Sequence, residues 1–112
     1  MVAICNTNNK ESGQKLYAHL FAYESILRAN LLPSVKVIAQ VLVYQGALDV
    51  NGCCITNEMT AGLTGLDVAT VHRQTALLTK LKIFHRHRKG RNNPYTYHFN
   101  RNTEEWEVER YV

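Results

Sequence analysis

The sequence has few cysteines and no long apolar run. Among its 112 residues only three are cysteine, and Cys53 and Cys54 are adjacent, a poor arrangement for a structural disulfide. The longest apolar stretches, 16–32 and 35–47, are interrupted by polar side chains before the roughly 20 residues that a membrane span needs. The opening MVAICNTNNK lacks the pattern of a secretion signal. We therefore expect reduced thiols in a cytoplasmic or nucleoid-associated protein that does not bind membranes.

Acidic residues are missing from a long part of the chain. Between Val68 and Arg101 there is no Asp or Glu, but there are eight Lys or Arg residues and four of the five histidines. The whole chain carries +4 and this segment +8, so the other residues together carry −4. Such an uneven distribution is the electrostatic footprint of a face that contacts phosphate backbones, although a solvated basic surface is the alternative.

Motifs for catalysis, metal binding and phosphate loops are also missing. The His-x-His at 85–87 and the cysteines at 53–54 lack the Cys-x2-Cys and His-x3-5-His spacings of zinc sites. Asp49, Glu58 and Asp67 fall in different turn or cap positions and form no acid pair, and no Gly-rich phosphate loop is present. We expect no enzyme, no metal, no cofactor and no small-molecule ligand.

The N-terminal part of the chain predicts an arm and two helices. Residues 1–12 are polar and Asn-rich, so we expect a flexible arm before a single domain at 13–112. Apolar spacing predicts helices over 14–29 and 33–44. The apolar stripe of the first comprises Leu16, Leu20, Tyr23 and Leu27, widened by Tyr17, Phe21 and Ile26. This stripe is broader than one neighbour needs, so the helix is either sandwiched in the core or part of a dimer interface.

A helix-turn-helix is predicted next. The stretch CCIT suits a small strand that leads to Thr56 as the N-cap of a short helix over 57–63, which would bury Met59 and Leu63. Gly65 suits a left-handed helix end, and Asp67 is a good N-cap for a helix from Val68 to about Lys80. Two helices joined by about four residues that include glycine are typical of this motif.

A β-hairpin with a cationic tip follows. IFHRHR and YTYHF alternate as strands do, and KGRNNP between them is loop chemistry. In this pattern Tyr95, Tyr97 and Phe99 share the inner face. The tail TEEWEVERYV predicts an edge strand or a helical turn capped by Thr103, with Trp106 against the core.

This order of elements resembles the winged helix-turn-helix family. That resemblance implies an α+β fold, a winged helix-turn-helix with an extra N-terminal helix and a C-terminal β-hairpin wing. The matching positions are Ile55, Thr56, Ala61, Gly65, Leu66, Asp67, Thr70, Val71, Arg73, Leu78, Leu81, Ile83 and Phe84. Lys82 stands where the family often has a left-handed glycine, and Thr75 where leucine is usual.

A narrower resemblance covers more of the chain. LYAHLFAYESILRAN, LLPSVKVIAQVLVYQG, TGL and FNRNTEEW are together similar to the N-terminal, origin-binding domain of phage replication initiators of the O type. Plasmid partition adaptors and small phage or archaeal regulators share the same core. The resemblance implies a phage or plasmid protein that recognises an origin, a partition site or an operator.

These features predict sequence-specific binding of double-stranded DNA. Helix 68–81 would enter the major groove, and wing 86–94 would contact the backbone or the minor groove. The expected base-reading residues are Val68, Ala69, Thr70, His72 and Arg73. The expected backbone and wing contacts are Thr56, Asn57, Arg86, Arg88, Lys89, Arg91 and Asn92. A homodimer through the N-terminal helix would pair two half-sites.

Two alternatives remain open on the sequence alone. Within DNA binding, the protein is either a replication or partition factor or a repressor of its own operon, since each uses the same surface. A module that binds RNA or an acidic protein is the alternative of another class, because Tyr95 and Tyr97 could stack on bases if they were exposed.

Overall fold

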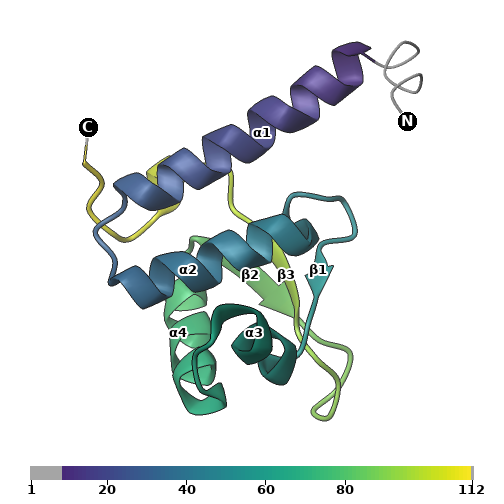
Figure 1. Cartoon of the computed structure of the whole chain (residues 1–112), viewed down its shortest axis with the longest axis vertical. Coiled ribbons are helices and arrows are strands. Elements are labelled where there is room, and N and C mark those ends of the chain that lie inside the picture. The colour runs from purple at the N-terminus through teal and green to yellow at the C-terminus, as the bar shows by residue number, and fades with distance from the viewer. Residues whose placement is uncertain (1–8, 112) are drawn as a thin grey trace.

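The described part of the chain folds into four α-helices and a small antiparallel sheet, which confirms the predicted α+β class. The computed structural model describes residues 9–111, with side chains from Leu16 onward. The helices are α1 (Asn9–Arg28), α2 (Pro33–Leu42), α3 (Asn57–Thr64) and α4 (Val68–Lys80), with a π-helical turn η2 (Val43–Ala47) after α2 and a 3-10 turn η3 (Thr103–Glu105). The strands are β1 (Cys53–Cys54), β2 (Phe84–His87) and β3 (Thr96–Phe99). Figure 1 shows α2 in the middle of the molecule, between α1 and the α3–α4 pair.

The sheet has β3 at its centre, with the order β1-β3-β2. Both neighbours pair antiparallel with β3, and Phe84 lies opposite Phe99 while Cys53 lies opposite Tyr97. These paired side chains are buried, and Phe99 makes edge-to-face contacts with both Phe84 and Trp106. The inner face of the hairpin therefore holds the aromatic part of the core, as its alternation predicts.

Helix α4 adds a further part of the core. Its buried side chains are Val71, Thr75 and Leu78, and α4 packs against α2, which buries Val35 and Ile38. Thr75 is a buried polar residue of this helix, and it donates its hydroxyl proton to the carbonyl oxygen of Val71 at 2.9 Å. The hydroxyl is thereby satisfied inside the helix, so a polar residue is tolerated in this core.

The N-terminal helix departs from its prediction in two ways. It begins at Asn9, so 9–12 of the expected arm are helical, while 1–8 lie outside the described residues. Polar composition misled here, because Lys, Glu and Gln are good helix formers. Its stripe is also not sandwiched in the core: Leu16, Leu20 and Leu27 are exposed, whereas the buried side chains of the helix are Ala22, Ser25 and Ile26, of which only Ile26 belongs to the predicted stripe. The buried face of α1 therefore combines Ile26 with the small Ala22 and Ser25.

Helix α3 likewise buries a different face from the predicted one. Met59 and Leu63 are exposed, and Thr60 is the buried residue of α3. The hydroxyl of Thr60 donates to the carbonyl oxygen of Thr56 at 3.1 Å, which satisfies it as the helix packs on α2 and α4. An eight-residue helix leaves too few apolar positions for periodicity to settle which face is buried.

The tail after β3 forms a 3-10 turn in place of an edge strand, and Thr103 does not cap this turn, because its N-cap position is Asn102 and no side chain caps it. The turn η3 starts at Thr103, and Arg110 forms an isolated bridge with Ala29 at the end of α1. Trp106 is buried between them and donates its indole N–H to the carbonyl oxygen of Asn100 at 2.9 Å. The tail is thus held to the core by Trp106, as predicted. No helix within residues 9–111 is long and apolar enough to cross a membrane.

The turn between α4 and β2 stores backbone strain at Lys82. This residue is the one non-glycine among the described residues with a positive φ, 65°. A left-handed conformation costs a residue with a Cβ roughly 1–2 kcal/mol relative to glycine. The Lys82 ammonium lies 3.1 Å from the Glu107 carboxylate, but both side chains are exposed, so the ion pair offsets little of this cost.

Replacing Lys82 by glycine is therefore expected to raise the free energy of unfolding by up to about 1 kcal/mol. Urea denaturation of the whole chain measures the change. Lys82→Ala is the matched control, since it loses the ion pair but keeps the strained φ, and it should not be stabilised. Equal stabilisation by alanine and glycine would contradict the assignment of strain to this turn.

Candidate functional site

The first two turns of α4 expose most of the predicted base-reading side chains. Asp67 caps the helix by accepting a hydrogen bond from the amide N–H of Thr70 at 2.7 Å, as predicted. Because Val71 is buried, the helical period turns Ala69, His72 and Arg73 toward solvent, and Val68, at the first position of the helix, is exposed as well. Thr70 is half-buried, and its hydroxyl accepts a hydrogen bond from the Arg73 guanidinium at 3.2 Å. Thr70 thus positions Arg73.

The carboxylate of Asp67 is held in its charged form at this helix start. The Thr70 amide N–H is the main cause that lowers the pKa of Asp67, and the Thr70 hydroxyl and the positive charge of Arg73 act in the same direction. The negative charge of Asp67 lies beside a surface that would contact phosphate, but it already interacts with the Thr70 donors and with Arg73.

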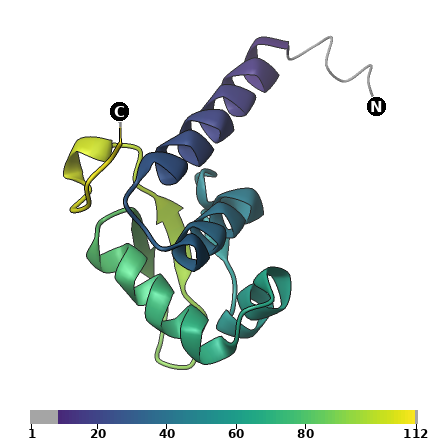
Figure 2. The ribbon, with the colours of Figure 1, turned by 60° about the vertical axis from the view of Figure 1, so that its left-hand side comes forward.

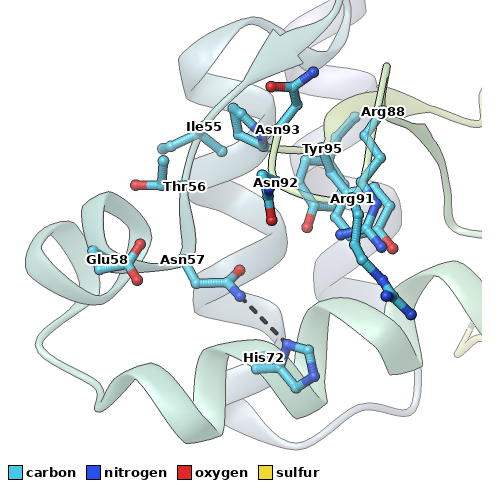
Figure 3. A pocket seen from close by; sticks show the side chains of 12 residues that line it. Ile55, Thr56, Asn57, Glu58, His72, Arg88, Arg91, Asn92, Asn93 and Tyr95 are labelled. Carbon is cyan, nitrogen blue, oxygen red and sulfur yellow. Dashed lines mark hydrogen bonds between the residues drawn. The ribbon is translucent and has the colours of Figure 1, made fainter.

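Helices α3 and α4 are joined at this surface by one side-chain contact. The Asn57 amide nitrogen lies 3.4 Å from Nδ1 of His72, and Figure 3 shows the two side chains facing one another. Thr56 begins α3 by accepting the amide N–H of Met59 at 3.1 Å, and its hydroxyl keeps a proton to donate. Gly65 ends α3 with φ 77°, the left-handed value that the sequence predicts.

A notch of about 230 Å³ lies between the start of α3, His72 and the loop that joins β2 to β3 (Figure 3). We call residues 88–95 the hairpin loop. Arg88 and Arg91 lie across the notch from Thr56. Five of the predicted backbone-contacting residues line it: Thr56, Asn57, Arg88, Arg91 and Asn92. Glu58 is the one acidic side chain in its lining. The notch can therefore hold an anion between donors from separate elements.

Two of the predicted wing residues lie elsewhere. Lys89 borders a second hollow on the other side of the hairpin, with Cys54 and His87. Arg86 is half-buried, and its guanidinium carbon lies 4.0 Å from the centre of the Tyr95 ring. Arg86 therefore supports the hairpin loop, while Lys89 is exposed at its tip.

Tyr95 has a role that the sequence pattern did not reveal. The guanidinium of Arg88 also lies over its ring, 4.6 Å from the centre, so two arginines make cation–π contacts with this tyrosine. Cation–π contacts of this kind stabilise a loop by about 0.5–1 kcal/mol each at exposed sites. Alternation predicts that Tyr95 faces inward, but it gives no signal for these contacts.

Two histidines of the sheet lie side by side, and its two cysteines differ from each other in burial. Nε2 of His87 lies 3.4 Å from Nε2 of His98. Cys53 and Cys54 are both free thiols, and burial followed by the charge of Cys54 raises the pKa of Cys53 to about 11. Among the described residues no three His, Cys, Asp or Glu side chains are placed to hold a metal ion.

No protein family, curated protein or solved structure was found to match this chain. The function of the surface formed by the start of α3, the first turns of α4 and the hairpin loop must therefore be inferred from its own chemistry.

The Asp67 cap makes part of the stability of this surface dependent on pH. The folded-state pKa of Asp67 is lowered, so its contribution is present above the unfolded-state pKa of about 4 and is lost as the pH falls through the folded-state value. Asp67→Ala should lower the melting temperature by a few degrees at pH 7. The difference in melting temperature between Asp67→Ala and the unmodified chain should be smaller at pH 2.5. Thermal melts followed by circular dichroism measure it.

Asp67→Asn is the matched variant, because asparagine caps a helix equally well without a titrating group. It should remain close to the unmodified chain at pH 7, and its advantage over Asp67→Ala should not vary with pH. A pH-independent difference between the unmodified chain and Asp67→Ala would show that the charged carboxylate does not stabilise α4.

Proposed function

We propose that this chain is a winged helix-turn-helix protein that binds double-stranded DNA in a sequence-specific way. The observation that carries the proposal is the convergence of three elements at one end of the molecule. Figures 1 and 2 both place α3, the start of α4 and the hairpin loop at the end away from α1. These elements carry four of the eight basic residues of the 68–101 segment, namely Arg73, Arg88, Lys89 and Arg91. An end of this shape and charge suits a duplex, since a helix fits the major groove while flanking donors bind phosphates.

The exposed start of α4 supplies the groups that distinguish bases. Val68 and Ala69 are exposed apolar side chains of the size that contacts a thymine methyl. Arg73 can donate two hydrogen bonds to the acceptors of guanine, and Thr70 holds its guanidinium. His72 is held through Nδ1 by Asn57, which leaves Nε2 for a base. We assign these residues to the major groove.

The notch and the hairpin loop supply the contacts that are independent of sequence. Thr56, Asn57 and the free amide N–H groups at the start of α3 suit a phosphate on one side of the groove. Arg88, Arg91 and Lys89 on the loop suit the neighbouring backbone or minor groove. Arg86 and Arg88 both lie over the Tyr95 ring, and these contacts hold the charges of the hairpin loop in place.

The structure favours duplex DNA over the RNA alternative. A base-stacking platform needs exposed aromatic faces, but Tyr97 is buried in the core and Tyr95 is covered by two arginines. The remaining surface is a protruding helix start between basic flanks, which matches a groove better than a single strand.

The biological role is proposed from the resemblance to phage and plasmid proteins. An origin or partition site is the first candidate, and the operator of the protein's own operon is the second. With DNA as its partner the protein would act in the cytoplasm or on the nucleoid. We also propose that it binds as a homodimer through its N-terminal helix.

Substitution of Arg73 should reduce sequence specificity, whereas substitution of Lys89 should reduce affinity for any duplex. On a duplex selected from a random pool, Arg73→Ala should weaken binding by about 1–3 kcal/mol and leave binding to a random duplex nearly unchanged. Lys89→Ala should weaken both duplexes to a similar extent and flatten the dependence of affinity on salt. Gel shifts across a range of salt concentrations measure both effects.

Lys36→Ala is a matched control, since Lys36 donates to the carbonyl oxygen of Leu27 away from this surface and should leave both affinities unchanged. Equal losses on selected and random duplexes for Arg73→Ala would refute its base-reading role. Tighter binding of single-stranded RNA than of duplex DNA at roughly 150 mM salt, where surface attraction is largely screened, would refute the proposed function itself.

A further inference from the structure

Helix α1 has an apolar face that the rest of the described chain does not cover. The exposed fractions are 62% for Leu16, 72% for Tyr17, 56% for Leu20 and 58% for Leu27. Phe21 beside them borders a hollow of about 340 Å³ together with Tyr17, Ala18 and Arg101. Large contiguous apolar patches on a protein surface commonly mark a site of interaction with another molecule.

The domain holds α1 mainly near its C-terminal end. Arg28 accepts the amide N–H of Tyr111 at 2.6 Å, and the N–H of Asn30 donates to Glu109 at 2.7 Å. Buried Ala22 and Ile26 face the core, and α1 packs on α2 and η2. Figures 1 and 2 show the N-terminal half projecting beyond the other elements. A projecting helix with exposed leucines gains stability when a partner covers it.

The spacing of the exposed leucines suits a second helix with the same spacing. Leu16, Leu20, Tyr23 and Leu27 are separated by four, three and four residues, the pattern of a helix–helix seam. Beside this seam Glu24 and Arg28 form an ion pair at 2.7 Å within the helix. This pair is neutral as a whole, so the charge that remains beside the face is that of Arg101 at the hollow.

We propose that this face is covered by α1 of a second copy of the same chain, related by a two-fold axis. An antiparallel arrangement would place Leu16 of each copy near Leu27 of the other and bring the two Leu20 side chains toward the centre. The exposed side chains supply on the order of 500 Å² per copy, so the pair reaches the roughly 1,000 Å² that a specific interface needs. A two-fold dimer is also the commonest form of self-association.

The interface leaves the proposed DNA surface free. Figures 1 and 2 show α1 at the opposite end from the α3–α4 turn and the hairpin loop. Two copies joined through α1 therefore present two DNA surfaces related by symmetry, which predicts paired half-sites. This consequence for DNA rests on the proposed function, and the inference adds to the homodimer proposed there the face of α1 that forms its interface, which is testable without DNA.

Sedimentation equilibrium of the full chain at micromolar concentrations tests the dimer. The unmodified chain should be dimeric, and Leu20→Glu should raise the dissociation constant of the dimer by roughly a hundredfold or more, because two carboxylates would meet at the seam. Val50→Glu is the matched control, since Val50 is a 95% exposed apolar residue in the turn after η2. It should remain dimeric.

Far-ultraviolet circular dichroism should show the same helical unfolding transition for both variants when they are diluted to monomers. A monomeric unmodified chain would mean that a different protein covers this face and would overturn the proposal. A dimer that Leu20→Glu does not weaken would place the interface elsewhere and would also overturn it.

Binding to duplexes separates this inference from the proposed function. Leu20→Glu should bind a single half-site as tightly as the unmodified chain does and should lose only the added affinity for paired half-sites. A dimer that binds no duplex would leave the α1 interface standing and refute the DNA proposal. An unmodified chain that is monomeric and binds single half-sites would refute the α1 interface and leave the DNA proposal standing.

Discussion

The packing of α4 against α2 is the constraint on which the rest of the structure depends. Val71, Thr75 and Leu78 are buried at this contact, and the side-chain amide of Gln74 donates to the hydroxyl of Ser34 at 2.9 Å. With one face of α4 held in this way, the helical period exposes the opposite side of its first two turns. The position of α4 also sets where the chain leaves it, at the left-handed Lys82, so that Ile83 and Phe84 enter the core. The hairpin loop is consequently held beside the start of α3.

The elements whose geometry is local could be predicted from the sequence. Thr56, Gly65 and Asp67 each act within a few residues of the chain, so their capping roles follow from residue type and position. The inner face of the hairpin was also predictable, because a strand has only two faces and the aromatic side chains all fall on one of them. For the same reason most of the exposed side chains at the start of α4 followed from one buried anchor, Val71.

The features that depend on tertiary neighbours could not be predicted in the same way. Leu16, Leu20 and Leu27 form the strongest apolar stripe of α1, yet the helix turns Ala22 and Ile26 toward α2. Periodicity identifies a stripe but not what covers it, and α1 has apolar residues on more than one face. Pairing of β1 with β3 joins residues more than forty positions apart, and the contacts of Arg86 and Arg88 with Tyr95 depend on side-chain conformation. Neither has a signature in the local sequence.

Charge and shape contribute differently to the proposed interaction. Basic side chains on the hairpin loop attract any nucleic acid, and that attraction weakens as salt is added. Discrimination between duplexes must come from the few groups at the start of α4, above all Arg73, whose guanidinium is held by Thr70. The carboxylate of Asp67 lies close to the same surface. It accepts a hydrogen bond from the Thr70 amide N–H and so caps the start of α4.

Selection of bound duplexes from a random pool, followed by sequencing, tests the central claim most directly. If α4 reads bases from the major groove, the bound fraction should be enriched in one short motif of a few base pairs. Pairs of this motif in inverted orientation should be enriched further if two copies bind together. A bound fraction with the composition of the starting pool would contradict the account, because it would show that the basic surface attracts DNA without reading its sequence.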